Sequence, residues 1–233
     1  MEAWLEWARG PMFCAALTFM VLGLARRVGI TVWQIVRALR RAADKDIPSR
    51  QVLRATLRWL VPTDRVGNRL LFSLTTMLFH VSIILVPLLL AGHIALWAPI
   101  LGFRLPAMPN LLATVLSVAA VAACLALLVQ RLVARDTRVL SRFQDYALPA
   151  VVAVPFASGL LVMHPAWNPF AYQPTLLVHV LSANFLLILI PITKLSHVVL
   201  LPATQLVSEV AWHFPPDAGS KVGVALHKES EPI

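Results

Sequence analysis

Seven histidines are the residues of this 233-residue chain best suited to chemistry, and four of them lie within long apolar runs. His80 and His93 share one run, and His179 and His197 share another. Ionisable side chains inside a membrane segment are rare and usually mark a functional site. Because neutral imidazole is a good axial ligand for iron, these four are candidate metal ligands. The other three are expected to be surface histidines at an outer end or in the tail: His164, His213 and His227.

The spacing of the four histidines favours a pair of facing helices. His179 and His197 are 18 residues apart, which is five turns and about 27 Å along a continuous helix, so both rings should leave the same face. His80 and His93 are 13 residues apart, about 20 Å along a helix but roughly 140° out of phase. Pro87 lies between them and could kink the helix, and Pro191 could do the same on the other run.

Two antiparallel helices with two histidines each are what a membrane cytochrome b requires. His80 and His197 would lie at an inner depth and His93 and His179 at an outer depth. The pattern therefore predicts two b haems, an inner one held by His80 and His197 and an outer one held by His93 and His179. An interhelical hydrogen bond is the alternative for each histidine taken alone.

The composition requires a membrane to dissolve these helices. Hydrophobic side chains make up 59% of the chain and charged ones 13%, whereas soluble proteins average about 45–50% and about 25%. An all-α fold with five spanning helices is expected, and the fourth, which contains Pro149, Pro155 and Gly159, could instead be re-entrant. The five spans are expected at about 11–29, 71–97, 111–133, 146–164 and 174–201.

Basic residues predict the orientation of these spans. Residues 26–69 contain eleven Lys and Arg and residues 131–145 contain four, whereas Arg104 is alone in the loop after Trp97. By the positive-inside rule both basic loops are cytoplasmic, so the N-terminus is outside and the C-terminus inside the cell membrane. The net charge of +9 then points to anionic lipid, and not to nucleic acid, as its partner.

Two further segments are expected outside the lipid. In the basic cytoplasmic loop 30–70, Ser49 could cap a helix to about Leu60 with Arg50, Arg54 and Arg58 in one stripe. Such a helix usually lies on the membrane surface, although docking on a soluble partner is an alternative. The chain thus divides into a membrane domain, 1–202, and an extended cytoplasmic tail, 203–233.

The fifth span carries a recognisable motif. It reads Leu177-Val178-His179, then Pro191-Ile192-Thr193-Lys194-Leu195-Ser196-His197 and Pro202. This closely resembles the gamma subunit of respiratory nitrate reductase, a di-haem cytochrome b that oxidises quinol. Phe79-His80-Val81 and Gly92-His93 look like that family's two ligand sites in the second span. The step from His80 to His93 is wider than in the family, and the family's outer lysine has no counterpart here.

The resemblance implies a role in electron transfer. Quinol would bind near the outer haem beside Gly92, His93 and Arg104, and electrons would reach a cytoplasmic iron–sulfur subunit through the inner haem. Lys194 and Arg69 could pair with haem propionates, or could simply be positive-inside residues. The departures suggest a relative that serves another redox partner, such as a quinone-reducing subunit of a heterodisulfide-reductase-like complex in sulfur metabolism.

Other classes of protein fit the sequence less well. The two cysteines, Cys14 and Cys124, lie in separate apolar stretches, which excludes a disulfide framework and c-type haem attachment. A transporter should show internal symmetry and acidic residues within its spans. The sequence shows neither feature. A membrane anchor without haem is the remaining structural alternative.

Overall fold

The computed structural model describes residues 1–41, 49–60, 70–211, 224, 225 and 227. Over these residues the chain is helical without strands, and five helical segments are long and apolar enough to cross a membrane. This confirms the expected all-α class and the number of spans. The described residues form two compact units, Met1–Val21 with Asp64–Lys194 and Leu22–Thr63 with Leu195–Ile233.

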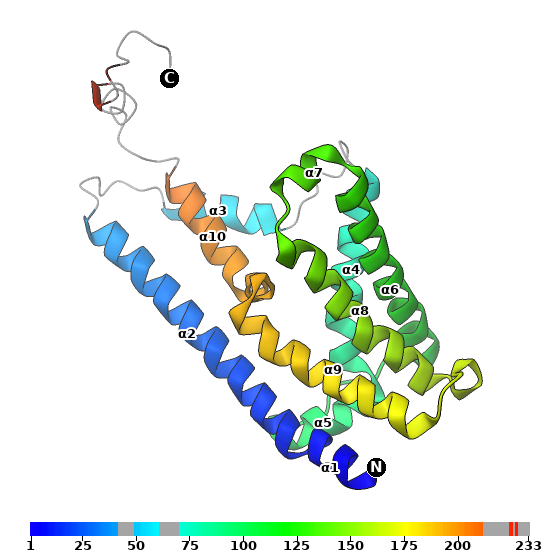
Figure 1. The fold of residues 1–233 in the computed structure, drawn as a ribbon. Helices are drawn as coiled ribbons and strands as arrows, with labels where there is room; N and C mark the ends of the chain where they lie inside the picture. Colours follow the sequence, from blue (N-terminus) through cyan, green and yellow to red (C-terminus); the bar gives the residue numbers. More distant parts are fainter. Residues whose placement is uncertain (42–48, 61–69, 212–223, 226, 228–233) are drawn as a thin grey trace. The chain divides into compact units, whose positions relative to one another are not determined.

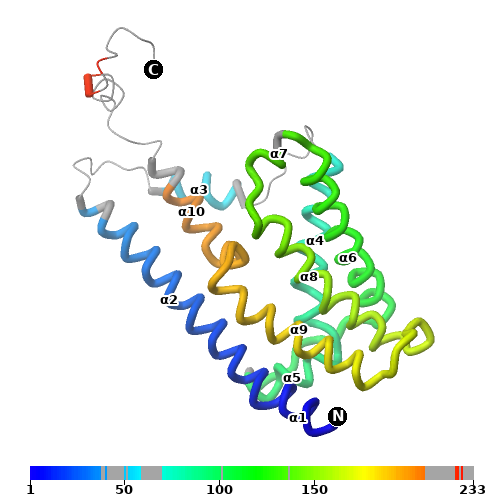
Figure 2. Tube along the Cα trace, in the orientation of Figure 1, coloured from blue at the N-terminus to red at the C-terminus, as the bar shows by residue number. Residues whose placement is uncertain are grey.

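The first unit is built around four long helices that lie side by side, as the ribbon and the trace both show (Figures 1 and 2). Helix α6 packs against α4 and α8, and α8 also packs against α9. Their bounds are α4 Leu70–Leu89, α6 Asn110–Val133, α8 Phe143–Met163 and α9 Tyr172–Ile192. Shorter elements join them: α5 Ala91–Leu101, α7 Arg135–Leu140 and the 3-10 turn η2 Pro165–Trp167.

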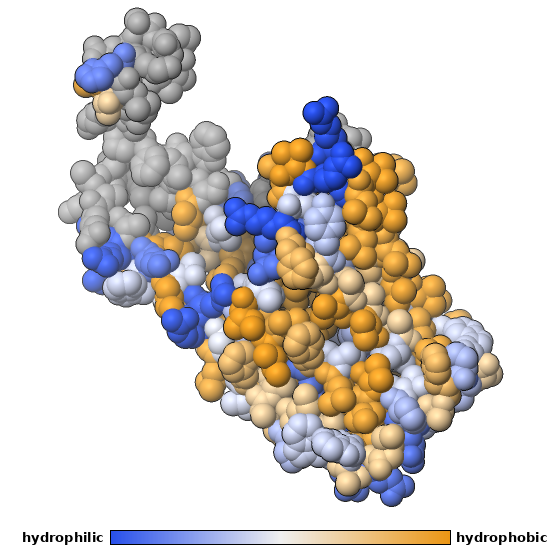
Figure 3. All heavy atoms as spheres, viewed as in Figure 1, coloured by the Kyte–Doolittle hydropathy of each residue, from blue (hydrophilic) through white to orange (hydrophobic). Residues whose placement is uncertain are grey.

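Small residues let α6 lie close to its neighbours. Ala113, Ala120 and Cys124 are fully buried and recur at helical spacing on one face of α6. Small side chains at such positions let two backbones approach, which is how membrane helices gain packing energy. The opposite face carries exposed apolar residues such as Leu125 and Val129. In Figure 3 apolar side chains cover much of this unit's visible face, as expected for a surface in contact with lipid.

The second span differs from the single helix expected over 71–97. Helix α4 ends at Leu89, Leu90 is extended (φ −69°, ψ 132°), and α5 begins at Ala91. A break inside a membrane protein is tolerated when other donors satisfy the freed carbonyls. Here the Met108 N–H donates to the Leu89 carbonyl at 2.9 Å, and the Trp97 indole N–H donates to the Pro87 carbonyl at 3.0 Å. The angle of roughly 140° between His80 and His93 assumed one continuous helix. It therefore does not apply.

The fifth span also differs from the continuous helix expected over 174–201. Helix α9 ends at Ile192, and Thr193 is extended (φ −117°, ψ −174°). A 3-10 turn, η3 Lys194–Ser196, and helix α10 His197–Ala211 follow. Pro191, the last residue but one of α9, permits a break here because it has no N–H for the helix ladder. The calculation of five whole turns from His179 to His197 is therefore wrong.

The ends of other elements also differ from the expected bounds. The first span is not limited to 11–29, because α1 Glu2–Arg9 precedes α2 and α2 Pro11–Arg41 extends into the expected loop. The tail is not extended from residue 203, because α10 runs to Ala211. The fourth span is the continuous helix α8, in which Pro149 and Pro155 are both accommodated.

The second unit contains the amphipathic helix that the sequence predicted. Helix α3 spans Ser49–Leu60, the expected bounds, and packs against α10. Val52 and Thr56, one turn apart, are both buried. The Thr56 hydroxyl donates to the Val52 carbonyl at 2.8 Å, so this buried polar group is satisfied within the helix. Helix α3 is therefore anchored along one face.

A buried amide joins the beginning of the chain to α9. Asn184 is 1% exposed, and its Nδ2 donates to the Ala8 carbonyl at 2.8 Å. Ala8 lies in the last turn of α1, where carbonyls lack intrahelical donors, and Pro11 removes one further donor. The side chain of Asn184 thus satisfies a helix end that would otherwise be unpaired in an apolar setting.

Replacing Asn184 with alanine is expected to destabilise the first unit. Hydrogen bonds between membrane helices contribute about 0.6 kcal/mol on average and up to about 1.7, and the lost side-chain volume adds to this. The free energy of unfolding of the protein in micelles, measured by titration with denaturing detergent, should fall by about 1–2 kcal/mol. Ser182→Ala is the matched control, because the Ser182 hydroxyl donates only to the carbonyl of its own turn, at His179. Equal losses in the two variants would contradict the assigned role.

Candidate histidine site

Two of the four candidate histidines come together in the first unit. The rings of His93, from α5, and His179, from α9, have centroids 5.9 Å apart and planes inclined by 12°. They lie 86 positions apart in the sequence and are brought together by the break at Leu90 and by the packing of α9 in the helical unit. Both rings are only partly exposed.

Backbone carbonyls fix the orientation of both rings. The Nδ1 of His93 lies 3.2 Å from the Val86 carbonyl oxygen, and the Nδ1 of His179 lies 2.9 Å from the Pro155 carbonyl oxygen. A carbonyl oxygen only accepts, so each Nδ1 carries the proton and each Nε2 keeps its lone pair. This is the arrangement in which a histidine is ready to ligate a metal through Nε2, with the other nitrogen held in place.

The close approach of α8 to α9 depends on Gly159. A Cβ at Gly159 would lie 3.0 Å from Cε1 and 3.1 Å from Nδ1 of His179. Gly159 lies one helical turn after Pro155, whose carbonyl accepts the His179 proton. Any side chain at this position would press on the ring, so Gly159 and Pro155 position His179 together.

His80 shows the same local pattern as His93 and His179. Its Nδ1 lies 2.7 Å from the Thr76 carbonyl oxygen, one turn earlier in α4. The group that orients this imidazole is thus the Thr76 carbonyl, whereas the Thr76 hydroxyl is buried and has no hydrogen-bond partner among the described residues. His80 lies in the first unit and His197 in the second, so their pairing stays a prediction.

The remaining expected site residues have different surroundings. Gly92 precedes His93 on α5, and a Cβ there would meet open space. Arg104 is exposed in the segment after Gly102. Lys194 pairs with Asp145 through a 2.6 Å Nζ–Oδ2 contact, and Arg131 lies 3.7 Å from the other carboxylate oxygen. A propionate would therefore have to share Lys194 with Asp145. Arg69 and His213 lie outside the described residues.

His164 is not part of the pair. Its Nε2 lies 2.9 Å from the Thr114 hydroxyl, and its ring stacks on Trp167 with centroids 4.2 Å apart. These contacts agree with its expected position at the end of a span, although the ring is half-buried and not fully at the surface. His164 therefore offers a natural control for substitutions of His93 and His179.

Sequence reasoning found the histidines but missed the groups that orient them. Pro155 and Gly159 were identified only as irregularities of the fourth span, and Trp97 only as the end of the second span. A signal was present in the spacing of Pro155 and Gly159, four residues apart on one face of a helix. Which face of α8 contacts His179 is a tertiary property, and the sequence does not encode it locally.

These features define the class: an all-helical, multi-span membrane protein with a histidine pair between two of its helices. The chain is 34% identical over 196 residues to a protein of Nitratidesulfovibrio vulgaris strain Hildenborough, and the match covers 82% of this chain and 85% of that protein. The chain therefore belongs to the same family as that protein, whose name, "Protein", specifies no activity. No family model matches the chain, and no solved structure matches it.

Proposed function

We propose that this chain is the haem b-carrying membrane subunit of a quinone-linked oxidoreductase, similar to the gamma subunit of nitrate reductase. The single observation that supports this best is the parallel pair of His93 and His179. Two parallel imidazoles with free Nε2 atoms, held between membrane helices, are the ligand set that a low-spin b haem takes.

The residues fit such a group. His93 and His179 would hold the group, since their ring centroids lie 5.9 Å apart and their planes are inclined by 12°. The two carbonyl acceptors, at Val86 and Pro155, set the tautomer that such binding requires. Among the described residues no cluster of three or more His, Cys, Asp or Glu could hold a metal ion.

Bound haem supplies one-electron transfer at a potential tuned by its ligands and surroundings. His93 and His179 would hold the haem, and the carbonyls of Val86 and Pro155 would keep the two rings in their present orientation. Apolar residues around α4 and α8 exclude water from this part of the unit, among them Val86 itself and Phe156. A dry setting strengthens the electrostatic effect of each nearby dipole on the site.

The second haem rests on His80 and His197. His80 is oriented by a carbonyl in the same way as the other two histidines, and His197 begins α10 immediately after η3. His93 is placed in a similar way, three residues after the break at Leu90. Lys194 and Arg69 remain candidates for binding the propionates.

The quinone and protein partners follow from the proposed orientation. The basic segments around α3 and α7 would face the cytoplasm and the N-terminus the outside, in a cell membrane with anionic lipid. Quinol would then react at the end that carries Gly92, His93 and Arg104, and an iron–sulfur subunit would bind at the cytoplasmic side. The terminal substrate would be converted on another subunit.

Purified full-length protein tests this function. Its reduced-minus-oxidised spectrum should show a Soret band and the α-band of a b haem, and extraction with pyridine should give two haems per chain. Adding a quinol analogue to the oxidised protein should then produce the reduced spectrum. A chain that folds without any haem, in a host that supplies haem to other cytochromes, would overturn the proposal in favour of an anchor.

A further inference from the structure

Helix α1 is fixed beside α9, the helix that carries His179. The two helices pack against each other, and Leu5 and Ala8 of α1 are both buried. The hydrogen bond from the Asn184 side chain to the Ala8 carbonyl joins them at a point five residues after His179. Five residues of helix correspond to about 7.5 Å along its axis, so the end of α1 lies near the level of that imidazole.

The first turn of α2 contacts α5, the helix that carries His93. Phe13 is 8% exposed, and its ring lies against that of Trp97, with centroids 5.4 Å apart. Trp97 is four residues after His93 and is itself fixed by its hydrogen bond to the Pro87 carbonyl. Figures 1 and 2 show α1 and α5 together at the end of this unit that holds the N-terminus. The junction between α1 and α2 therefore borders both helices of the histidine pair.

Arg9, in the last turn of α1, lies at this junction. Its charge acts through space on the His179 ring, and the residue is exposed. No acidic side chain among the described residues forms an ion pair with Arg9. A cation placed in this way beside two imidazoles is suited to a ligand that brings its own negative charge.

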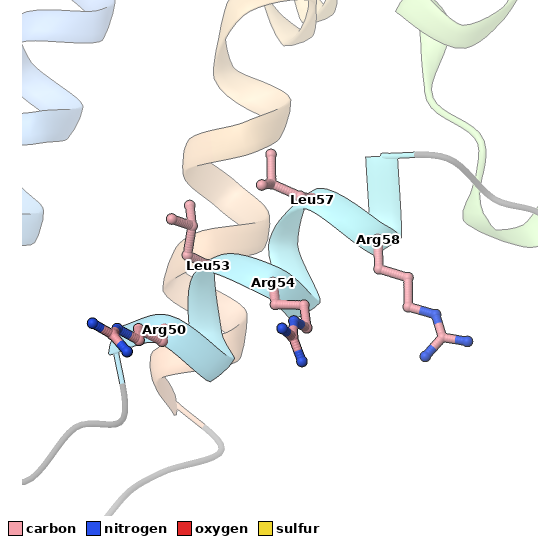
Figure 4. A pocket seen from close by; sticks show the side chains of 5 residues that line it. All are labelled: Arg50, Leu53, Arg54, Leu57 and Arg58. Carbon is pink, nitrogen blue, oxygen red and sulfur yellow. The ribbon is translucent and has the colours of Figure 1, made fainter.

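Other basic side chains are placed differently. Arg131 and Lys194 share Asp145, at the ends of α6 and α9 that are far from the N-terminus. Arg104 is exposed beyond the end of α5. Figure 4 shows three more arginines on α3, which belongs to the second unit: Arg50, Arg54 and Arg58. Of the described basic residues, Arg9 is therefore the one that helix contacts and an electrostatic interaction both link to the histidine pair.

We propose that Arg9 binds a propionate of the haem that His93 and His179 would hold. A guanidinium group donates two parallel N–H bonds to one carboxylate, and such charge-assisted bonds are shorter and stronger than neutral ones. The same contact would join the beginning of the chain to the cofactor. This inference rests on the proposed function, and it makes Arg9 a binding residue and not a catalytic one.

Haem titration of the full-length protein tests the role of Arg9. His80→Ala is introduced first, because under the proposed function it leaves only the outer site, and the protein is prepared without haem. Two probes are titrated: iron protoporphyrin, and its dimethyl ester, in which both propionates are uncharged. Arg9→Gln should weaken the binding of iron protoporphyrin by about tenfold or more, as expected for the loss of a hydrogen bond to a charged group. The affinity for the ester should stay nearly unchanged, because the ester has no carboxylate for Arg9 to bind.

Matched variants separate a charge effect from a packing effect. Arg135→Gln removes the same charge from α7 and should change neither affinity. If Arg9→Gln fails to fold, Arg9→Lys keeps the charge but loses the paired geometry, and it should still weaken only the binding of iron protoporphyrin. Equal weakening of both porphyrins in an Arg9 variant, or no weakening of either, would overturn this inference and leave the proposed function intact. Failure of the protein without the Arg9 change to bind iron protoporphyrin would overturn both.

Discussion

Replacing His179 with alanine is expected to reduce the haem content of the purified protein from two haems per chain to one. His179 is one of two parallel rings, and a single remaining imidazole cannot provide both axial ligands of a six-coordinate haem. His93→Ala should cause the same loss. The α-band absorbance per chain should fall by about half, and pyridine extraction measures the remaining haem directly.

The matched control for this loss is His164→Ala. His164 lies at the end of α8 and contacts Thr114 and Trp167, so its removal should leave both haems in place. A second expectation concerns stability: a ligand that binds only the folded state stabilises it by RT ln(1 + [L]/Kd). The His179→Ala protein should therefore also unfold at lower temperature than the His164→Ala protein. Full haem content in both histidine-pair variants would show that the ligands lie elsewhere.

Replacing Gly159 with valine is expected to have the second large effect. A Cβ at this position lies 3.0 Å from the His179 ring, and the ring cannot move away freely because its Nδ1 is bound to the Pro155 carbonyl. Overpacking of this kind costs about 1–3 kcal/mol. The free energy of unfolding should fall by that amount in haem-free protein, which separates the packing effect from cofactor binding.

In the haem-loaded protein the same substitution has a spectroscopic consequence. A displaced His179 ring changes the angle between the two imidazole planes, so the electron paramagnetic resonance g-values and the midpoint potential of one haem should shift. The milder Gly159→Ala should shift the signal without loss of haem. Gly29→Val on α2 is the control, since nothing lies within 4 Å of a Cβ there. Equal behaviour of the Gly29 and Gly159 variants would show that Gly159 has no positioning role.

Much of the architecture follows from composition and hydropathy. Five runs of apolar residues are long enough to span a membrane whatever their neighbours are, so the number of spans is a local property of the chain. Helix α3 is local too, because the arginine stripe and the apolar residues at helical spacing both indicate a helix over these residues. The placement of four histidines within apolar runs is equally visible in the sequence.

The breaks in the second and fifth spans could not be derived from composition and hydropathy. Proline occurs inside α4, α8 and α9, yet α8 contains Pro149 and Pro155 and remains continuous. The span that contains Pro87 breaks three residues later, at Leu90, where Trp97 and Met108 supply donors for the freed carbonyls. Proline permits a break, but donors from distant residues decide where it is stable.

What the sequence determined by itself is therefore the number of spanning segments, the amphipathic helix α3 and the histidines that could act. What only the tertiary structure decided is the meeting of His93 with His179 and the carbonyls that orient them. The physical reason is the distance along the chain over which each effect acts. Burial in lipid acts on every residue of a run independently, whereas the direction of an imidazole depends on a break in its own span and on a glycine in another helix.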